Sequence, residues 1–495
     1  MNFLQGLSDV SNFLSQGINN IGIGNFGGGI NDGTISSSEP AVPDLSSPFD
    51  FNLKSVILSD SSGSSSLDLT AYLVELNYYE DIFGDCISGK VVLSDSVGVI
   101  FQSRMNGTEK LTISFTSGTN TGKPDLIQHS FRVYSISGRH FDIGGNFENY
   151  TINFCSEEML LSEKYRISKS YKQKTISDMI NDILQNYLHT NKKLNIDSTT
   201  GIYDIVVPNK KLFETINWLA YYAQSTSYTG ADMLFYESNS GYYFKSLQSL
   251  YTQSPNFAYA YNPANIVPTN SDAFNNEVLT IMKLDILNTF DTLKATTKGT
   301  FTNRLITIDP ILRKKYINDF NYNDYQSSSR KLNEHDVTNN SDNGSRPSYY
   351  DRMGQSLYTI GNSIVEAGPL NLMVTNSNQQ AQSPTISQNA GSVVSDFFVE
   401  RTAKYRNAQL ALSNYTRIKI MVPGNSAITV GTVLDIDVFS ADVESMESTA
   451  PGKRKEDSYL SGNYLVTAVR HVINLNRYIT VVELAKESNR NTGKG

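Results

Sequence analysis

The chain has 495 residues, which is too long for a single hydrophobic core, and 39% of them are apolar, which suffices for folded domains. Its formal net charge of −8 argues against sequence-independent binding of nucleic acid, because such binding needs Lys and Arg against phosphates. Two cysteines cannot form a disulfide framework, and no run approaches the roughly 18 apolar residues of a transmembrane helix, so we expect a soluble protein made in a reducing cytoplasm, without membrane anchoring.

Residues 1–48 are expected to form an N-terminal extension that carries a short amphipathic helix. Residues 1–53 contain five acidic and no basic side chains, and residues 22–48 are rich in Gly, Ser and Pro. The apolar residues before that tract recur every three or four positions and would form one stripe on a helix, a candidate partner-docking face: Phe3, Leu7, Val10, Leu14 and Ile18. A helix this short is marginal alone, so the segment is either a frayed tail or a helix that orders against a partner.

Residues 49–172 have the pattern of a β domain. The stretch LTISF, at residues 111–115, alternates apolar and polar side chains with the period of two that is typical of a half-buried strand. Similar runs precede and follow it as far as residue 154. We therefore predict a first β-barrel in this segment.

Residues 173–270 are predicted to form helices and an inserted α+β domain. A helix begins near Ile176, because Thr175 and Asp178 have the spacing of a capping box before an apolar face. A second helix contains Trp218, the single Trp of the chain. We expect this helix to bury Trp218 as a packing anchor between the insert and a barrel, with a role as interface anchor as the alternative. A β-hairpin is expected around residues 238–241.

The second half of the chain returns to β sequence and is interrupted by a polar stretch. Residues 271–319 are strand-like and are assigned to the start of a second barrel. Residues 320–395 are rich in Asn, Ser, Gln and Gly, with little periodicity, and are expected to be a long polar extension or loop. Residues 396–488 hold a helix near 398–412 and the remainder of the second barrel, and residues 489–495 form a C-terminal tail.

Two stretches far apart in the chain resemble each other. Residues 131–154 read FRVYSISGRHFDIGGNFENYTINF, and residues 461–484 read SGNYLVTAVRHVINLNRYITVVEL. Each contains an Arg-His pair, Arg139–His140 in the first and Arg470–His471 in the second, and each follows an alternating strand. We predict two copies of one small β-barrel, against the alternative that antiparallel β sequences merely look alike.

The duplication predicts how copies of the chain assemble. Three chains would present six like units, so a trimer would match a ring with sixfold symmetry. Joining the edge strands of six units would close a large barrel, whose inward face is polar because it lines a water-filled channel. The alternating strands supply the candidate lumen-facing residues: Asp435 and Asp437 in the second unit, and Thr112 and Ser114 in the first.

No catalytic, cofactor-binding or metal site is expected. The stretch GIGNFG at residues 22–27 fits a dinucleotide-binding pattern, but no strand precedes it, so a linker is favoured. Cys86 and Cys155 lie far apart without a CxxC pattern, which argues against zinc. Glu80 and Asp81 are adjacent carboxylates, but neighbours on a strand point to opposite faces, which disfavours a glycosidase pair.

The order of four stretches resembles the central baseplate hub proteins of contractile-tailed, T-even-like bacteriophages, and more distantly the hub part of type VI secretion spike proteins. The stretches are GIYDIVVPNKKLFETINWLAYYA, DMLFYESNSGYYFKSL, VPGNSAITVGTVLDI and SGNYLVTAVRHVI. The resemblance covers residues 50–310 and 396–488 and depends on element order, with no catalytic signature. It implies a mainly β (α+β) fold, with two tail-tube-like β-barrel domains, an inserted α+β domain and long polar extensions.

The resemblance also implies a function that is structural and not enzymatic: a homotrimeric ring in the virion tail baseplate that joins the sixfold tail tube to the threefold spike. The implied partners are the central spike protein, tail-tube and tube-initiator proteins, the tape-measure protein, baseplate wedge proteins, and viral DNA that passes through the lumen without specific binding. Acidic and neutral side chains in the lumen would let DNA slide. The rivals are a tube initiator or distal tail protein, which would need hexamers, and a cell-wall hydrolase of the injection machinery, which would need a clustered acid pair.

Overall fold

The computed structural model describes residues 51–490 with several gaps. The chain divides into two units, residues 1–44 and 45–495, and every described residue belongs to the second. The gaps are residues 61–62, 64, 104, 118–125, 142–146, 229–231, 262–277, 310–313, 323–328, 337–364, 370–398, 440–456 and 458. The stripe from Phe3 to Ile18 therefore lies outside the described residues. In the described part, no helix is long and apolar enough to cross a membrane.

The first β unit is an antiparallel arrangement of strands in the order β3-β4-β7-β6-β5-β1-β2. Its alternating apolar side chains enclose one core, and Leu111, Ile113 and Phe115 are buried in it, as the period of two predicted. Its elements are β1 (Phe51–Ser59), β2 (Ser66–Asp68), β3 (Leu73–Asp81), β4 (Ser88–Asp95), α2 (Val99–Ser103), β5 (Lys110–Ser117), β6 (Ile127–Phe141) and β7 (Glu148–Cys155).

The α+β insert has a hydrophobic core of its own. The hydroxyl of Thr175 accepts a hydrogen bond from the N–H of Asp178 and caps α4, as the capping-box spacing predicted. The predicted hairpin is present, with β13 and β14 paired as far as Ser238 and Gly241. The insert comprises α3 (Glu157–Lys164), β8 (Arg166–Ile167), β9 (Ser170–Lys174), α4 (Ile176–Asp182), a π-helical turn (Ile183–Tyr187), β10 (Leu194–Ile196), β11 (Tyr203–Val206), β12 (Lys210–Lys211), α5 (Leu212–Tyr222), β13 (Met233–Ser238), β14 (Gly241–Ser246) and α6 (Leu247–Tyr251).

The second β unit has strands in the order β16-β21-β24-β23-β22-β15. Alternating residues of β22, such as Leu434 and Ile436, are fully buried in a second core. β15 was expected inside the insert, but its pairing with β22 places it in this unit. The strands are β15 (Phe257–Tyr261), β16 (Lys283–Asn288), β21 (Thr416–Pro423), β22 (Val433–Val438), β23 (Gly462–Asn474) and β24 (Arg477–Lys486).

The strand pairing of the first unit is repeated in the second. The path β3-β4-β7-β6-β5-β1 matches β16-β21-β24-β23-β22-β15, strand by strand and in the same chain order. Both hairpins have a register shift at the corresponding place, between Val133 and Ser135 and between Val466 and Ala468. One pairing differs: β15 is parallel to β22, whereas β1 is antiparallel to β5. The duplication that the sequence predicted is therefore present in the order of strands.

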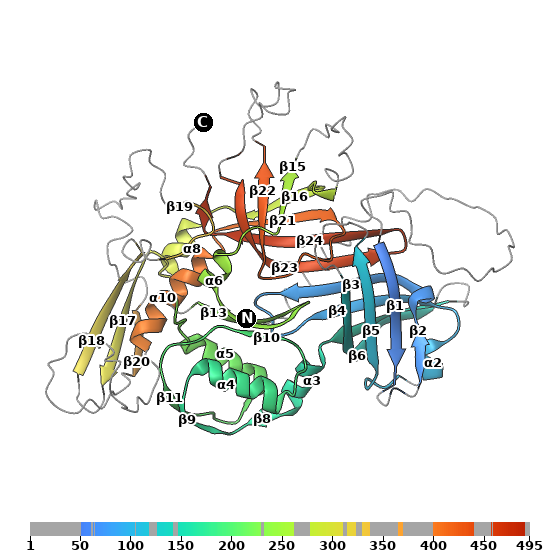
Figure 1. Cartoon of the computed structure of the whole chain (residues 1–495), viewed down its shortest axis with the longest axis horizontal. Coiled ribbons are helices and arrows are strands. Elements are labelled where there is room, and N and C mark those ends of the chain that lie inside the picture. Colours follow the sequence, from blue (N-terminus) through green and yellow to red (C-terminus); the bar gives the residue numbers. More distant parts are fainter. Residues whose placement is uncertain are drawn as a thin grey trace. The chain divides into compact units, whose positions relative to one another are not determined.

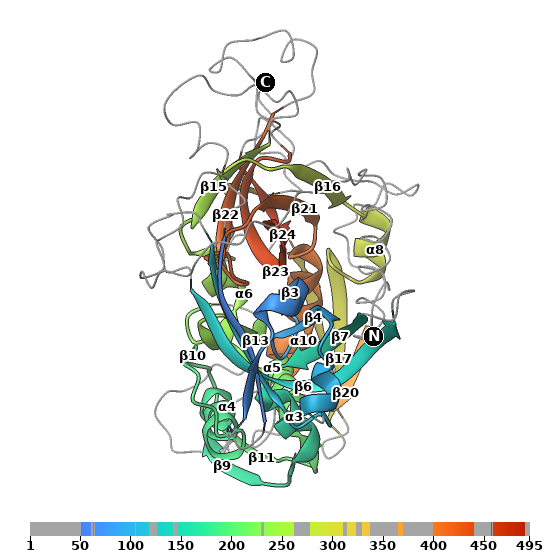
Figure 2. The same ribbon diagram turned by 90° about the vertical axis from the view of Figure 1, so that its right-hand side faces the viewer.

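The two units do not form two closed barrels in the described part of the chain. β3 of the first unit pairs with β23 of the second, so strands of both units lie in one 13-stranded sheet. Figure 1 shows blue β3 beside red β23, and Figure 2 shows the same neighbours after a quarter turn. Closure of one unit would require its own outer strands to pair, and the described strands contain no such pairing. The mainly β fold is confirmed, and among the described strands the two units share one continuous sheet, without a pairing that closes either unit.

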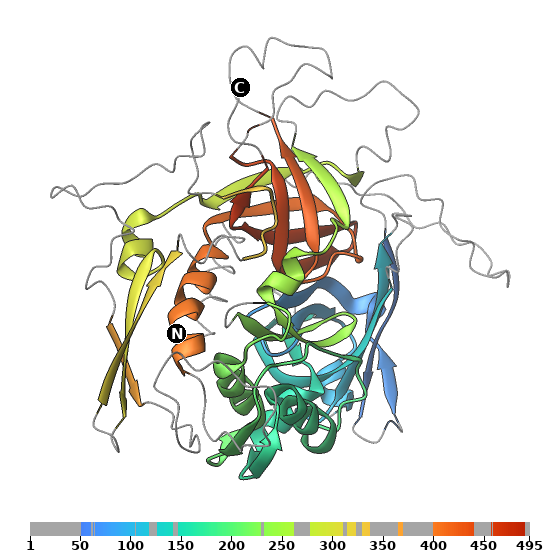
Figure 3. The same cartoon turned by 60° about the vertical axis from the view of Figure 1, so that its left-hand side comes forward.

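A separate small sheet occupies sequence that was assigned to the second barrel and to the polar extension. β17 (Thr302–Asp309) pairs with β18 (Lys314–Asn321) and, in parallel, with β20 (Val365–Pro369). The predicted helix near residues 398–412 is α10 (Val399–Leu412), and Figure 3 shows it between this sheet and the insert. The remaining short elements are α8 (Thr292–Thr297), β19 (His335–Asp336) and β25 (Ser488–Asn489). Residues 320–395 are thus partly structured, because β19 and β20 pair with strands distant in sequence.

Candidate assembly site

The joint between the two β units is formed by β23 and β3. The first part of β23 pairs with β22, and residues 468–474 pair with residues 75–81 of β3. In this register Ile473 lies opposite Leu76, and His471 lies opposite Tyr78. All four side chains are fully buried. Burial of this much apolar surface makes the joint an extension of the hydrophobic core.

His471 is buried in an aromatic cluster at this joint. Its ring centroid lies 5.7 Å from that of Tyr78 and 6.2 Å from that of Phe115. Its Nδ1 is 2.8 Å from the hydroxyl oxygen of Tyr478. Burial lowers the pKa of His471 to about 3, against a smaller opposing effect of a hydrogen bond with the backbone of Ile428. The imidazole is therefore neutral at physiological pH and acts as a packing residue.

The repeated Arg-His pair occupies two different environments. Ser137, and not Arg139, corresponds to Arg470, because the first hairpin has an additional register shift after Ser137. Arg470 donates two hydrogen bonds to Oδ1 of Asn77, at 2.6 and 2.8 Å, on the polar side of the joint. Arg139 instead forms an ion pair with Glu148 on its own hairpin. The sequence motif identified the correct hairpins, although its residues are not structurally equivalent.

The chain enters the second unit directly after β3. Ile82 is fully buried in the second core, and its N–H donates to the carbonyl oxygen of Thr467 at 2.9 Å. Glu80, only 2% exposed, accepts hydrogen bonds from the N–H of Val430 in the second unit and of Asn239 in the insert, both at 3.0 Å. Burial raises the pKa of Glu80 to about 8, partly offset by those two hydrogen bonds. One carboxyl group therefore connects three parts of the protein.

A half-buried lysine, paired with two buried carboxylates, fixes the insert to the first β unit, and sequence reasoning missed it. Lys192 donates to Glu158 at 2.7 Å and to Glu237 at 2.6 Å. Glu237 also accepts from the N–H of Ile87 and the hydroxyl of Ser156, both in the first unit. Burial alone would lower the pKa of Lys192, but the two carboxylates outweigh it and raise that pKa. No local pattern signals these residues, because each lies on a different element.

Two strand edges that correspond to the joint are open within one chain. Residues 134–141 of β6 correspond to the part of β23 that holds β3, but among the described strands they pair only with β7. β16 corresponds to β3, and its described pairing is with β21 alone. Both edges expose apolar side chains: Tyr134 is 53% and Phe141 68% exposed on β6, and Ile286 is 50% exposed on β16. Exposed apolar side chains along an unpaired strand indicate an interaction surface.

The four candidate lumen-facing residues lie at equivalent positions of the two units. The registers of β5 with β6 and of β22 with β23 match Thr112 to Asp435 and Ser114 to Asp437. All four point away from the two apolar cores, because they alternate with core residues. Thr112 shares a hydrogen bond with a neighbouring Ser130, and Ser114 is buried. Their place in a lumen stays a prediction, since it depends on assembly.

Cations share the polar face of the sheet with these carboxylates. Arg490 pairs with both Asp435 and Asp437, and the Asp437 contact measures 3.0 Å. On the same face, Arg417 pairs with Glu483 at 2.7 Å, and Lys283 pairs with Asp285 at 3.0 Å. The face therefore carries charges of both signs, several of them paired, where the sequence had suggested acidic and neutral groups alone.

Trp218 is half-buried. It packs on the core of the insert, and its ring meets that of Tyr222 edge-on at 6.3 Å between centroids. This position is compatible with packing inside the insert. A role as interface anchor stays a prediction.

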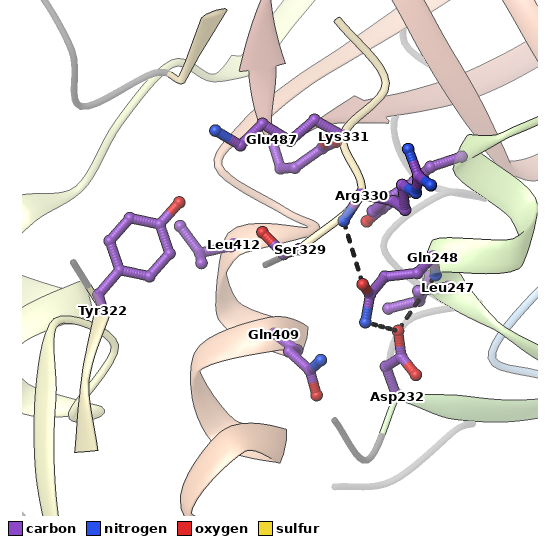
Figure 4. Close-up of a pocket in the computed structure, with 11 residues that line it drawn as sticks. Asp232, Leu247, Gln248, Tyr322, Ser329, Arg330, Lys331, Gln409, Leu412 and Glu487 are labelled. Carbon is purple, nitrogen blue, oxygen red and sulfur yellow. Dashed lines mark hydrogen bonds between the residues drawn. The ribbon is translucent and has the colours of Figure 1, made fainter. Parts of the chain in front are cut away.

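A pocket between the insert, α6, α10 and residues 329–331 does not have the chemistry of an active site (Figure 4). Asp232 is buried there and accepts from the hydroxyl of Ser246 at 2.8 Å and from the N–H of Gln248 at 3.1 Å. The side chain of Gln248 accepts in turn from the N–H of Arg330 at 3.1 Å. Burial raises the pKa of Asp232. The carboxyl group connects backbone segments. The other acid that lines the pocket, Glu487, accepts a hydrogen bond from the N–H of Leu332 at 2.6 Å.

The described residues contain no group of three or more His, Cys, Asp or Glu side chains that could hold a metal ion. Cys86 and Cys155 are free thiols, the first half-buried and the second buried. Burial raises the pKa of both thiols, so neither is prepared as a nucleophile. The geometry of the described residues supports an assembly surface.

Comparison with known proteins supplies the context for this surface. The chain is 24% identical over 424 residues to the "Probable baseplate hub protein gp334" of Vibrio phage KVP40, which covers 85% of this chain and 90% of the relative. The chain is a baseplate hub-like protein. It is accordingly a structural component of a phage tail baseplate, and not an enzyme. No family model matches the sequence of the hub-like protein.

Solved structures show only distant likeness to the hub-like protein. The tail protein from Neisseria meningitidis MC58 has a TM-score of 0.48 at 9% identity, covering 89% of this chain and 97% of its own. The 43 kDa tail protein of prophage MuSo2 from Shewanella oneidensis has a TM-score of 0.46 at 8% identity, covering 88% and 98%. At TM-scores below 0.5 these likenesses establish no shared fold. The duplicated strand order is therefore supported by the strand pairings of this chain and not by these structures.

Proposed function

We propose that three copies of this hub-like protein form a ring in the virion tail baseplate, which adapts a sixfold tail tube to a threefold central spike. The ring would leave a lumen that forms part of the conduit for viral DNA. The protein acts in this proposal as a structural adaptor and performs no chemistry. The synthesis of the chain in the host cytoplasm fits its two free thiols.

One observation supports this proposal above the others: a single chain holds two β units with the same strand order, already joined edge to edge through β3 and β23. A contact that links two like units within a chain can be repeated between chains, and a repeated head-to-tail contact closes into a ring when the rotation permits. Three chains then supply the six like units that a sixfold tube requires.

The polar face of the sheet is the surface proposed to line the lumen. Asp435, Asp437, Thr112 and Ser114 lie on this face, opposite the apolar cores. Some of its cations are paired with carboxylates, as Arg417 is with Glu483. Paired cations attract DNA phosphates less than free cations do, so the polyanion would pass without specific binding.

Other baseplate components are proposed as partners of the remaining surfaces. These partners are the central spike, tail-tube and tube-initiator proteins, the tape-measure protein, and the baseplate wedge. The stripe from Phe3 to Ile18 is proposed to dock on one of them. Deleting residues 1–21 should then weaken that contact without lowering the melting temperature of the remaining protein, and a large drop in melting temperature would count against the idea.

Native mass spectrometry of the purified protein tests the proposed ring. The expected main species has three times the mass of the 55.0 kDa chain. A hexamer would favour the rival reading as a tube initiator or distal tail protein, because such subunits supply one unit each. The other rival, a cell-wall hydrolase, predicts loss of turbidity when the protein is added to bacterial walls, and we expect none.

A further inference from the structure

We propose that neighbouring copies join through β6 of one copy and β16 of the next, in the register by which β23 meets β3 within the chain. This inference rests on the proposed ring and adds the contact that closes it. The occupant of the open β6 edge is therefore a second copy of this chain, which presents its own open edge strand. The within-chain joint is the template for every pair of residues named below.

The hairpins give the equivalent positions on β6 and β23. Both contain a register shift at the corresponding place, and beyond it Phe141 lies opposite Glu148 as Ile473 lies opposite Tyr478. Phe141 therefore corresponds to Ile473, and the preceding His140 corresponds to Val472. The additional shift in the first hairpin adds one residue before His140, which leaves these two matches unchanged.

The other partners give the equivalent positions on β16 and β3. Lys90 on β4 and Lys419 on β21 correspond, because each lies opposite the matching residue of β7 or β24. Asn77 pairs with Lys90, and Asp285 pairs with Lys419. Asp285 thus corresponds to Asn77. By the same step, Leu284 corresponds to Leu76.

The template then names the contacts between copies. Within the chain, Ile473 lies opposite Leu76, and both are fully buried. Between copies, Phe141 lies opposite Leu284 of the next copy, which would bury a phenyl ring that is 68% exposed in the single chain. His140 lies opposite Asp285 of the next copy, a pairing of an imidazole with a carboxylate. Apolar and charge-compatible pairs at facing positions stabilise antiparallel strands.

The residue that follows each edge strand points to the same joint. Ile82, directly after β3, is buried in the core of the neighbouring unit. Phe290, shortly after β16, is 64% exposed in the single chain. On the next copy, the equivalent region lies near Tyr134, which is 53% exposed at the bulge of β6. Phe290 would therefore pack near Tyr134 of the next copy, as Ile82 packs in the core of the second unit within the chain.

A disulfide trap tests the register. The double variant Phe141→Cys, Leu284→Cys places two thiols at facing positions of adjacent antiparallel strands, where a disulfide can form. After mild oxidation we expect covalent species of two and three chains on a non-reducing gel. The matched control, Phe141→Cys with Val206→Cys, uses a 70% exposed residue of the insert, and should give the background of the single variants.

The outcomes separate this joint from the ring itself. A wild-type trimer in native mass spectrometry without cross-linking of the double variant would overturn the β6–β16 joint and leave the ring intact. Absence of the wild-type trimer would overturn both. Cross-linking of the control to the same extent would show that the thiols meet by random collision, and would also overturn the joint.

A pair of charge substitutions at His140 and Asp285 tests the same register through trimer formation, without oxidation. His140→Asp should weaken the trimer, because it faces Asp285 of the next copy with a like charge. Adding Asp285→Arg to the same chain should restore the trimer. Restoration by Asp285→Arg requires that the two positions face each other, so its failure in a folded double variant would contradict the proposed register.

Discussion

Glu80 is the side chain that connects the first β unit with both the second β unit and the insert. It is buried, and its two oxygens accept the N–H groups of Val430 and Asn239. A carboxyl group in this position has a free-energy cost when it ionises, because burial disfavours the charged form. Its protonation should therefore be measurable as a change in stability with pH.

We predict that the stability of the wild-type protein decreases relative to Glu80→Gln as the pH rises from 5 to 8. The pKa of Glu80 is raised from 4.5 to about 8, so the folded state holds the proton over this range while the unfolded state releases it. One pKa unit corresponds to about 1.4 kcal/mol, so the difference amounts to a few kcal/mol at most. Melting temperatures of both proteins across this range would show it, and parallel curves would contradict it.

Lys486 should respond to pH in the opposite direction. It is fully buried, donates to the carbonyl oxygen of Ser461 at 2.9 Å, and lies over the Tyr464 ring. Burial lowers its pKa from 10.5 to about 7, so the unfolded state binds more protons between these values and stability from this group increases as the pH rises. Lys486→Met should raise the melting temperature at pH 7 and have a smaller effect at pH 10. An equal effect at both values would contradict the lowered pKa.

Among the elements, the joint between β3 and β23 connects the two cores. A substitution of the fully buried Ile82, which directly follows β3, tests this connection. Ile82→Ala should lower the free energy of unfolding by about 2–4 kcal/mol, because it leaves a cavity in the second core. The neighbouring Phe83 is 50% exposed, so Phe83→Ala is the matched control and should change stability by well under 1 kcal/mol. Urea denaturation of both variants measures the difference, and equal losses would contradict the assigned burial.

Elements defined by local periodicity could be predicted from the sequence. The alternation of residues 111–115 and 434–438 gave two strands, and even the matching of Thr112 to Asp435 agrees with the strand registers. The cap at Thr175 and the hairpin of β13 and β14 follow from equally local signals. In each case the pattern depends on residues close together in the chain.

Elements defined by distant pairing could not be predicted. β20 and β19 are short strands in a polar stretch, and they are strands only because β17 and β25 pair with them. The pairing of β3 with β23 likewise selects one edge among several with similar sequence patterns. Glu80 and Lys192 have roles that depend on the meeting of three or more elements, which no spacing in the sequence expresses.

For the whole molecule, the central claim is that one β unit occurs twice in the chain and that the within-chain joint is repeated between copies. The two units share strand order, and each unmatched edge exposes apolar side chains, such as Phe141 on β6 and Ile286 on β16. A single chain is then a third of a closed ring. It contains one joint, between β3 and β23, and its open β6 and β16 edges each supply one strand of a joint with a neighbouring copy.

Electron cryomicroscopy of the assembled ring tests this claim most directly, through the rotation that superimposes one β unit on the next. The account predicts a rotation of about 60° around one common axis, both from the first to the second unit within a chain and from the second unit to the first unit of the next chain. Two clearly different rotations, or units that fail to superimpose strand by strand, would contradict it.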